Sequence, residues 1–285
     1  MHDFVNAALD AARLAGASYA DARVVHEREE RISVRSGRVD ALESSESLGI
    51  GVRVISEGAW GFAATRELDP DSIAACARQA VAIARASTLT SHAPVLLSDV
   101  GVFRDTWSGT CEIDPFTIPL EDKLALLLSA DEALRVPKEV AVSTAHLGFL
   151  SVTKLFASTE GSVIEQSYTE SSGGIVAFAL GDGEMLPRSY PNSHGGQAVQ
   201  GGWEAILALD LAGHAPRVAQ EAAALVSAIP CPSTETTVII DGSQLGLQVH
   251  ESVGHPTELD RVLGDEAAFA GTSFVRVEDI DALQY

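Results

Sequence analysis

The sequence predicts an α+β protein of several domains, in which helices pack on antiparallel sheets. Three features lead to this prediction. Apolar residues recur at helical spacing in several stretches, β-branched residues alternate with polar ones in others, and glycine-containing turns separate the alternating stretches. Proline-containing connections divide the chain into predicted domains at residues 1–92, 93–230 and 231–285.

The first predicted domain combines two helices with antiparallel strands. Apolar residues recur at helical spacing from Asp3 and predict a helix that ends at Gly16. The β-branched alternations of residues 20–65 are interrupted by the turn sequences RSGR and SEGA, which are typical of connections between antiparallel strands. Pro70 then favours the start of an alanine-rich helix over residues 71–87.

The middle predicted domain has a similar order of elements. Helical periodicity returns over residues 119–136, with acidic residues in the first turn. Two alternating stretches, residues 140–159 and 162–180, meet at the turn sequence STEGS and predict a hairpin. A single helix is predicted over residues 203–228.

The last predicted domain begins with a strand and a helix. Residues 236–242 carry the β-branched run of a strand. Leu245, Val249 and Val253 then recur every four residues, as the buried stripe of a helix does. Asp241 or Ser243 can accept hydrogen bonds from the first free amides of that helix. We therefore expect this helix to lie beside a strand of the C-terminal domain.

Composition restricts the partners of the protein. The chain has 40 Asp and Glu against 19 Lys and Arg, a formal net charge of -21, which repels nucleic acid and anionic lipid surfaces. Neither a basic leader nor an apolar run of about 18 residues is present, so we expect a cytoplasmic protein without a membrane span. The three cysteines, Cys76, Cys111 and Cys231, are far apart and are interpreted as buried free thiols.

The sequence HESVGH, from His250 to His255, is the main candidate for chemistry. The zinc-protease signature H-E-x-x-H places its histidines four residues apart on one helical face. On a regular helix a spacing of five turns the two side chains about 140° apart. Gly254 and Pro256 are the residues that let a helix widen, so we expect a departure from α geometry between Val249 and Pro256, with an i to i+5 turn that brings both imidazoles to one side.

These residue types suit hydrolysis by a metal. Neutral imidazoles of His250 and His255 hold Zn²⁺, the metal lowers the pKa of a water molecule, and the carboxylate of Glu251 accepts its proton. Glu258 and Asp260 are candidates to orient an imidazole by accepting its other N–H. The alternative is a solvated helix end with two partly exposed histidines and ordinary surface carboxylates.

A second motif has less support. The sequence SVTK, Ser151 to Lys154, matches the S-x-x-K nucleophile pattern, but it lies in an alternating stretch and not at a helix start. We interpret it as part of a strand.

Residues 250–274, HESVGHPTELDRVLGDEAAFAGTSF, resemble the TldD/PmbA family of metallopeptidases, whose members have also been described as modulators of DNA gyrase. Residues 49–65 look like the glycine-rich hairpin of the family's first domain, and the sequence RSY at residues 188–190 falls where its second domain has similar residues. The resemblance covers essentially the whole chain. It implies the TldD-like catalytic type, with Zn²⁺ on His250 and His255, Glu251 handling the proton, and unfolded or extended peptides as substrates.

The resemblance also sets expectations for partners and for the metal. Members of the family commonly pair, one bearing the motif and one lacking it, so a homo-oligomer or such a heterodimer is expected. A non-catalytic peptide-binding or partner subunit is the alternative, while direct action on nucleic acid or gyrase is disfavoured by the charge. The third zinc ligand of the family is a cysteine near the C-terminus of a longer chain, and no cysteine follows His255 here. We therefore expect a truncated form with an incomplete third domain, weak zinc retention and little peptidase activity by itself.

Overall fold

The computed structural model describes residues 1–91 and 93–282, so residue 92, where the predicted first domain ends, lies outside the described residues. Contacts divide the chain into two compact units. Unit 1 consists of Met1–Pro191 and Gly195–Ser227, and unit 2 consists of Asn192–His194 and the chain from Ala228 onward. The three predicted domain ranges stay predictions.

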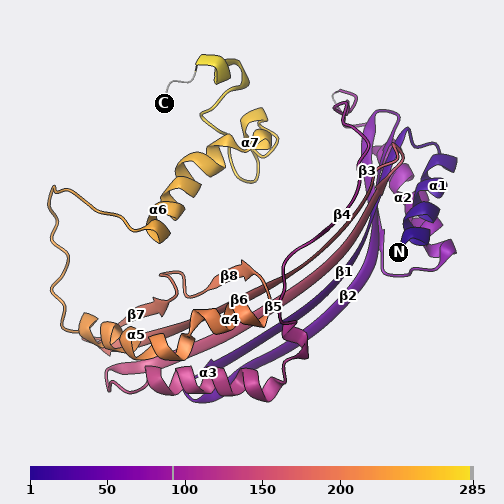
Figure 1. Ribbon diagram of the computed structural model, residues 1–285. Coiled ribbons are helices and arrows are strands. Elements are labelled where there is room, and N and C mark those ends of the chain that lie inside the picture. Colours follow the sequence, from indigo (N-terminus) through magenta and orange to yellow (C-terminus); the bar gives the residue numbers. More distant parts are fainter. Residues whose placement is uncertain (92, 283–285) are drawn as a thin grey trace. The chain divides into compact units, whose positions relative to one another are not determined.

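Unit 1 is built on one sheet, in which the described residues form eight strands (Figure 1). The order is β3-β2-β1-β5-β6-β4, with β7 and β8 also paired to β6. All pairs are antiparallel except β4 with β6, which confirms the predicted antiparallel α+β class. The strands are β1 (Tyr19–Arg35), β2 (Arg38–Ser56), β3 (Ala59–Thr65), β4 (Arg104–Ser108), β5 (Val140–Ser158), β6 (Val163–Gly181), β7 (Glu184–Tyr190) and β8 (Gln197–Gln200).

The helices of unit 1 follow the predicted positions, with one correction. Asp69 caps α2 by accepting from the amides of Asp71 and Ser72, and Pro70 is its first residue, as predicted. The single helix predicted over residues 203–228 is wrong, because Asp210 adopts a left-handed φ of 45°, ends α4 and caps α5 through the amide of Gly213. The helices are α1 (His2–Leu14), α2 (Pro70–Ser87), α3 (Leu120–Leu134), α4 (Trp203–Leu209) and α5 (Leu211–Leu225), with a 3-10 turn at Pro115–Thr117.

Two separate apolar cores hold these helices to the sheet. One lies under α1 and α2 and contains Ala22 and Val24 of β1. The other lies under α3, α4 and α5 and contains Ile32 and Val34 of the same strand. Because side chains of a strand alternate between its faces, both helical layers pack on the same face of β1. Between the two cores, residues 42–48 of β2 are exposed, whereas β1 is partly covered.

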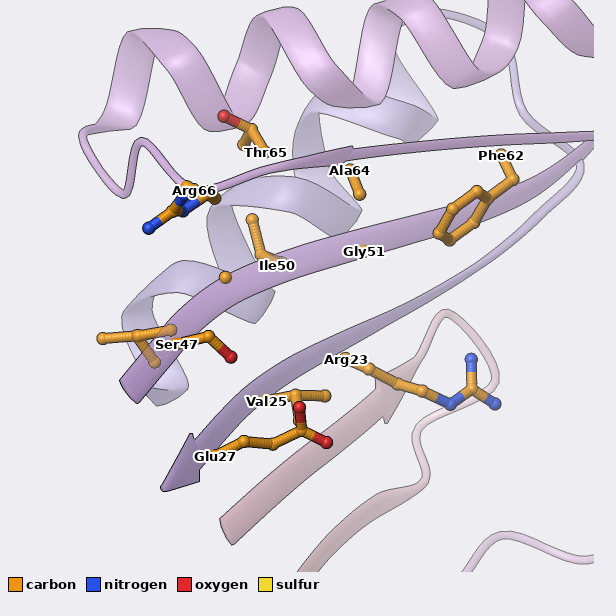
Figure 2. Close-up of a pocket in the computed structure, with 12 residues that line it drawn as sticks. Arg23, Val25, Glu27, Ser47, Ile50, Gly51, Phe62, Ala64, Thr65 and Arg66 are labelled. Atoms are coloured by element: carbon orange, nitrogen blue, oxygen red, sulfur yellow. The ribbon is translucent and has the colours of Figure 1, made fainter. Parts of the chain in front are cut away.

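A hollow of about 560 Å³ lies on the sheet at the place where β3 ends (Figure 2). Gly49 and Gly51 of β2 contribute no side chains to it, while Phe62 and Ala64 of β3 and Arg66 beyond the strand line its rim. A Cβ atom added to Gly51 would stand 3.0 Å from the ring of Phe62, so the glycine keeps this hollow open.

A buried carboxylate ties the far tip of the β1–β2 hairpin to α3. Ser36 and Gly37 form the turn with positive φ angles of 47° and 82°, which suits a two-residue hairpin. The amide of Gly37 donates to Asp131 at 2.7 Å, the hydroxyl of Ser143 donates to it at 2.6 Å, and Arg135 Nε donates at 2.9 Å. Asp131 is fully buried, so its charge depends on these three donors.

Asp131→Ala is expected to lower the free energy of unfolding by about 3 kcal/mol, because it leaves the buried hydroxyl of Ser143 without its acceptor and removes the acceptor of Gly37 and Arg135. Urea denaturation followed by circular dichroism measures the change. The matched control is Glu132→Ala at the exposed neighbouring position of α3, for which a change within about 0.5 kcal/mol is expected. Equal midpoints for the two variants would show that the network does not stabilise the fold.

Unit 2 contains short helical elements and contributes none of the buried core residues in its described part. The elements are α6 (Gly242–Val249), a π-helical turn (His250–Gly254), a 3-10 turn (His255–Thr257), α7 (Leu259–Leu263) and a 3-10 turn (Val277–Ala282). The strand predicted over residues 236–242 is wrong: no described strand pairs with it, and Ile239 is 96% exposed. A β-branched run becomes a strand only where a partner completes its hydrogen bonds. The described part of unit 2 therefore offers no strand beside the helix that carries His250. None of the described helices is both long and apolar enough to cross a bilayer.

Candidate metal centre

The helix that leads into the HESVGH sequence begins as predicted. Asp241 accepts a hydrogen bond from the amide of Gln244 at 3.0 Å, and the hydroxyl of Ser243 donates to the same carboxylate. Asp241 is therefore the capping residue of α6, and Ser243 supports it. The stripe of Leu245, Val249 and Val253 is exposed in the structure, which corrects the predicted burial, because no described element of unit 2 packs on it.

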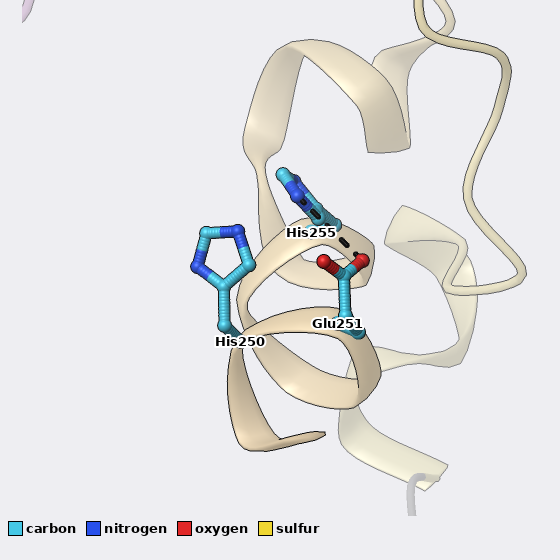
Figure 3. Close-up of side chains that lie close together, drawn as sticks. All are labelled: His250, Glu251 and His255. Carbon is cyan, nitrogen blue, oxygen red and sulfur yellow. Dashed lines mark ion pairs between the residues drawn. The ribbon is translucent and has the colours of Figure 1, made fainter. Parts of the chain in front are cut away.

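The backbone then widens as the sequence predicts. Residues His250–Gly254 form a π-helical turn, and the amide of His255 donates to the carbonyl of His250 five residues earlier. Gly254 sits at the end of this turn, and Pro256 has no amide to continue the regular pattern. The two imidazole rings consequently lie on one side of the helix, with centroids 4.3 Å apart (Figure 3). The predicted departure from α geometry is confirmed.

Three side chains of this turn can share one metal ion. His250, Glu251 and His255 each offer a ligand atom, and these atoms lie within 4.8 Å of one another. Two ligand atoms on one tetrahedral zinc are about 3.4 Å apart, since each bond is roughly 2.1 Å. Small rotations of these solvent-accessible side chains reach that spacing. Nitrogen and carboxylate donors also suit Zn²⁺, so the donor set fits the metal.

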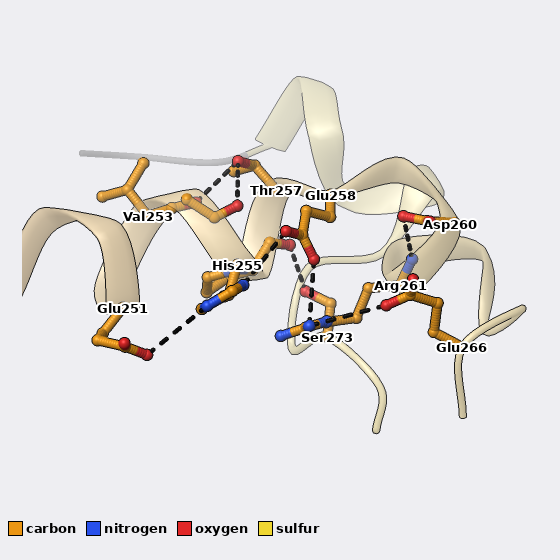
Figure 4. A network of polar contacts seen from close by, with 11 residues as sticks. Glu251, Val253, His255, Thr257, Glu258, Asp260, Arg261, Glu266 and Ser273 are labelled. Carbon is orange, nitrogen blue, oxygen red and sulfur yellow. Dashed lines mark hydrogen bonds and ion pairs between the residues drawn. The ribbon is translucent and has the colours of Figure 1, made fainter. Parts of the chain in front are cut away.

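Glu258 holds the second histidine in place. Its Oε1 lies 3.2 Å from Nδ1 of His255 (Figure 4), so an N–H at Nδ1 donates to this carboxylate and Nε2 is left for a metal. Glu251 approaches the other nitrogen, with its Oε2 3.9 Å from Nε2 of His255. Glu258 therefore lies at Nδ1 of His255 and Glu251 near its Nε2, so only Glu251 is on the side where a metal would bind.

Asp260 belongs to a neighbouring acidic group and makes no hydrogen bond or ion pair with His250 or His255. Its carboxylate accepts from the amide of Arg261 at the start of α7, at 3.1 Å. Arg261 reaches Glu258 at 3.1 Å and Glu266 at 3.7 Å (Figure 4). Desolvation, followed by the charge of Asp260, raises the pKa of Glu266. The guanidinium of Arg261 offsets the negative charge of this acidic group. Because Arg261 also pairs with Glu258, it links the group to His255.

Two further residues support the turn and were not predicted as part of the site. The hydroxyl of Thr257 donates to the carbonyl of Val253 at 2.7 Å, and Ser273 donates to the carbonyl of Pro256 at 2.6 Å (Figure 4). Thr257 follows Pro256 directly, so its position in the turn was accessible to sequence reasoning. Ser273 lies 17 residues from its partner, and no local pattern indicates that contact.

The other candidates fall outside this group. Ser151 and Lys154 belong to β5 and pair with residues of β1, which confirms that SVTK is part of a strand. Among the described residues, no cysteine belongs to the metal-binding group. All three cysteines are free; Cys76 is buried, and burial raises its pKa. Cys111 and Cys231 are exposed, which corrects their predicted burial.

Comparison with known proteins gives two domain-level matches. Residues 20–84 match the PmbA/TldA metallopeptidase domain 1, and residues 113–228 match the PmbA/TldA metallopeptidase central domain. Both models describe parts of one class of protein, the metallopeptidases. The chain belongs to the PmbA/TldA metallopeptidase family.

Individual relatives agree with this assignment. A metalloprotease of Methanocaldococcus jannaschii is 26% identical over 92% of this chain and 58% of its own length. A metalloprotease of Synechocystis is 29% identical over 81% of this chain and 48% of its own length. The chain thus spans about half the length of the curated relatives it matches.

Solved structures share the fold. A Thermotoga maritima protein described as a modulator of DNA gyrase aligns with a TM-score of 0.64 at 16% identity, over 82% of this chain and 50% of its own. TldE of Thermococcus kodakarensis aligns with a TM-score of 0.54 at 14% identity, over 77% and 47%. At these identities the likeness concerns the fold.

Proposed function

We propose that this chain carries the zinc-binding helix of a peptidase that cleaves unfolded or extended peptides. The single observation that carries the proposal is the π-helical turn, which brings His250 and His255 together with Glu251 between them in sequence. A widened turn is an irregularity that packing does not require here, because the turn is exposed. Membership of a metallopeptidase family supports the same conclusion.

The proposed roles follow from the contacts of each side chain. His250 and His255 would hold Zn²⁺, which when bound supplies a Lewis acid for the scissile carbonyl and for a water molecule. Glu258 fixes the ring of His255 through Nδ1. Glu251, exposed beside Nε2 of the same ring, accepts the proton of the attacking water and returns it to the leaving amine.

A third protein ligand is part of the proposal. Catalytic zinc sites have three protein ligands and one open position, and Glu251 is assigned to the proton. We infer that the third donor comes from outside the described residues, with a cysteine as the ligand implied by the family resemblance. Zinc retention by the described donors alone is therefore expected to be weak.

The partners and location of the protein are proposed on sequence grounds. A homo-oligomer, or a heterodimer with a family member lacking the histidine motif, is consistent with the pairing implied by the resemblance. We propose a cytoplasmic location, and the charge of -21 disfavours direct binding to nucleic acid or membrane. A non-catalytic peptide-binding subunit is the competing function.

Peptide cleavage with and without a zinc chelator tests the proposed function. The polypeptide as its gene encodes it is incubated with a fluorogenic unstructured peptide. We expect cleavage that phenanthroline abolishes and that added Zn²⁺ restores, since the metal supplies the Lewis acid. Peptide binding without turnover, unaffected by the chelator, would instead indicate the non-catalytic subunit.

A further inference from the structure

The outer edge of β2 is free along most of the strand. β3 pairs with β2 only from Ile50 to Ser56. Along residues 38–49, no other strand in the described part of the chain pairs with this side of β2. An edge strand turns the N–H and C=O groups of alternate residues outward, where another chain can bind them. This stretch is therefore an open position for an additional strand.

The free edge is accessible within unit 1. Residues 38–40 and 42–48 are exposed, although they belong to a regular strand. Neither apolar core contains a residue from this stretch of β2, and the contacts of α3 with the middle of the hairpin are made on β1, as between Lys123 and Glu30. A polypeptide could thus approach the edge without moving any element of unit 1.

The free stretch of β2 has three carboxylates, Asp40, Glu43 and Glu46, against one cation, Arg38. Asp40 and Glu43 of β2 and Glu27 of the neighbouring strand form no ion pair among the described residues. By contrast, nearby Glu30 is bound to the buried Lys123 at 2.6 Å. Free carboxylates on an edge favour a cationic partner, which the net charge of -21 attracts over a longer range.

The same charges disfavour a second copy of the chain at this edge. If two copies paired antiparallel about Ser44 and Ser45, Glu43 of each copy would lie opposite Glu46 of the other. Like charges directly opposite each other destabilise a strand pair. That register is unfavourable for a second copy, whereas a basic polypeptide meets opposite charges at Glu43 and Glu46.

The hollow at the end of β3 adjoins the free edge of β2. Ser47 and Gly49 of the free edge line the hollow together with Phe62 and Ala64 of β3 (Figure 2). A strand added beside the free edge of β2 would lie in line with β3, and one of its ends would reach the hollow. Since the lining is mainly apolar and Phe62 is 58% exposed, the hollow fits a large apolar side chain.

We propose that the free edge of β2 binds an extended, basic polypeptide segment as an added strand, with one large apolar side chain in the hollow. Backbone hydrogen bonds supply affinity in this mode, and the side chains supply selectivity. We further propose that the bound segment is a substrate of the peptidase, and this part of the inference rests on the proposed function. The binding itself requires no metal, because every residue involved lies in unit 1.

Fluorescence anisotropy in the presence of a zinc chelator tests the binding separately from cleavage. The probe is a labelled short peptide that alternates lysine and threonine around one phenylalanine, and its counterpart has glutamate in place of lysine. We expect the lysine peptide to bind at least about tenfold more tightly. Equal affinities would overturn the proposal, whether or not the protein cleaves peptides.

Backbone N-methylation distinguishes strand addition from charge attraction alone. Two isomers of the lysine peptide carry N-methyl groups on alternate residues, in opposite registers. Because only every second amide faces an edge strand, one isomer is expected to lose binding and the other to retain it. Equal binding by both isomers would contradict an added strand.

Variants locate the binding on β2. Glu43→Lys is expected to weaken binding of the lysine peptide about tenfold, and Phe62→Ala about fivefold. The matched control is Glu184→Lys on the exposed strand β7, which pairs with β6, and we expect it to leave the affinity unchanged. If Glu43→Lys behaves like Glu184→Lys, the site is not on this edge.

Discussion

Glu251→Gln is expected to lower kcat/KM for peptide cleavage by about three orders of magnitude while zinc remains bound. The amide keeps the shape of the side chain but cannot accept the proton of the attacking water. Both imidazoles stay in place, because the π-helical turn is held by backbone hydrogen bonds and not by this carboxylate. Kinetics on an unstructured peptide and elemental analysis for zinc measure the two effects.

The control for this variant is Glu278→Gln, which removes an exposed carboxylate elsewhere in unit 2 and should cleave at the parent rate. Both comparisons use the polypeptide as its gene encodes it. Parental activity in the Glu251→Gln protein would show that another group handles the proton. A parallel loss of zinc would mean that Glu251 is a ligand and not a base.

His250→Ala and His255→Ala are each expected to weaken zinc binding by at least about a hundredfold, because each removes one of the few protein ligands. Competition with a chromophoric chelator measures the affinity. Glu258→Gln should have a smaller effect, about tenfold, since it weakens the hydrogen bond at Nδ1 of His255 but leaves both imidazoles that would bind the metal.

The control for the histidine variants is His214→Ala. This imidazole stacks on Tyr190 in unit 1, with ring centroids 4.0 Å apart, and has no place in the proposed site. Unchanged zinc affinity in the absence of both His250 and His255 would contradict the assigned ligands. Retention of stoichiometric zinc after Cys111→Ser and Cys231→Ser would show that neither of these cysteines supplies the third donor.

Much of the candidate metal centre could be predicted because its determinants are local. The motif occupies six consecutive residues, and Gly254 and Pro256 disturb the helix where the spacing of the histidines requires it. Glu258 is three residues beyond His255 and lies within reach on the same turn. The contact from Ser273 could not be predicted, because it closes a loop whose shape has no periodic signal.

Two elements were predicted wrongly because local sequence patterns do not show contacts. The periodicity of residues 203–228 continues through Asp210, whose left-handed conformation ends one helix and whose carboxylate starts the next. The run at residues 236–242 has the composition of a strand, but composition does not supply a pairing partner. In both cases the local pattern was compatible with the prediction. The cap formed by Asp210 decided the first outcome, and the lack of a pairing strand among the described residues decided the second.

By itself, the sequence determined the helices with clear caps, the hairpin between β5 and β6, and the widened turn at His250, because each depends on residues close together in the chain. Only the tertiary structure decided that β1 pairs with β5, through pairs such as Val24 with Leu155, so that strands of two predicted domains form one sheet. It also decided that Asp131 reaches the turn at Gly37. Contacts across such long loops must repay the entropy of loop closure, and whether they do depends on packing and buried hydrogen bonds that no local pattern encodes.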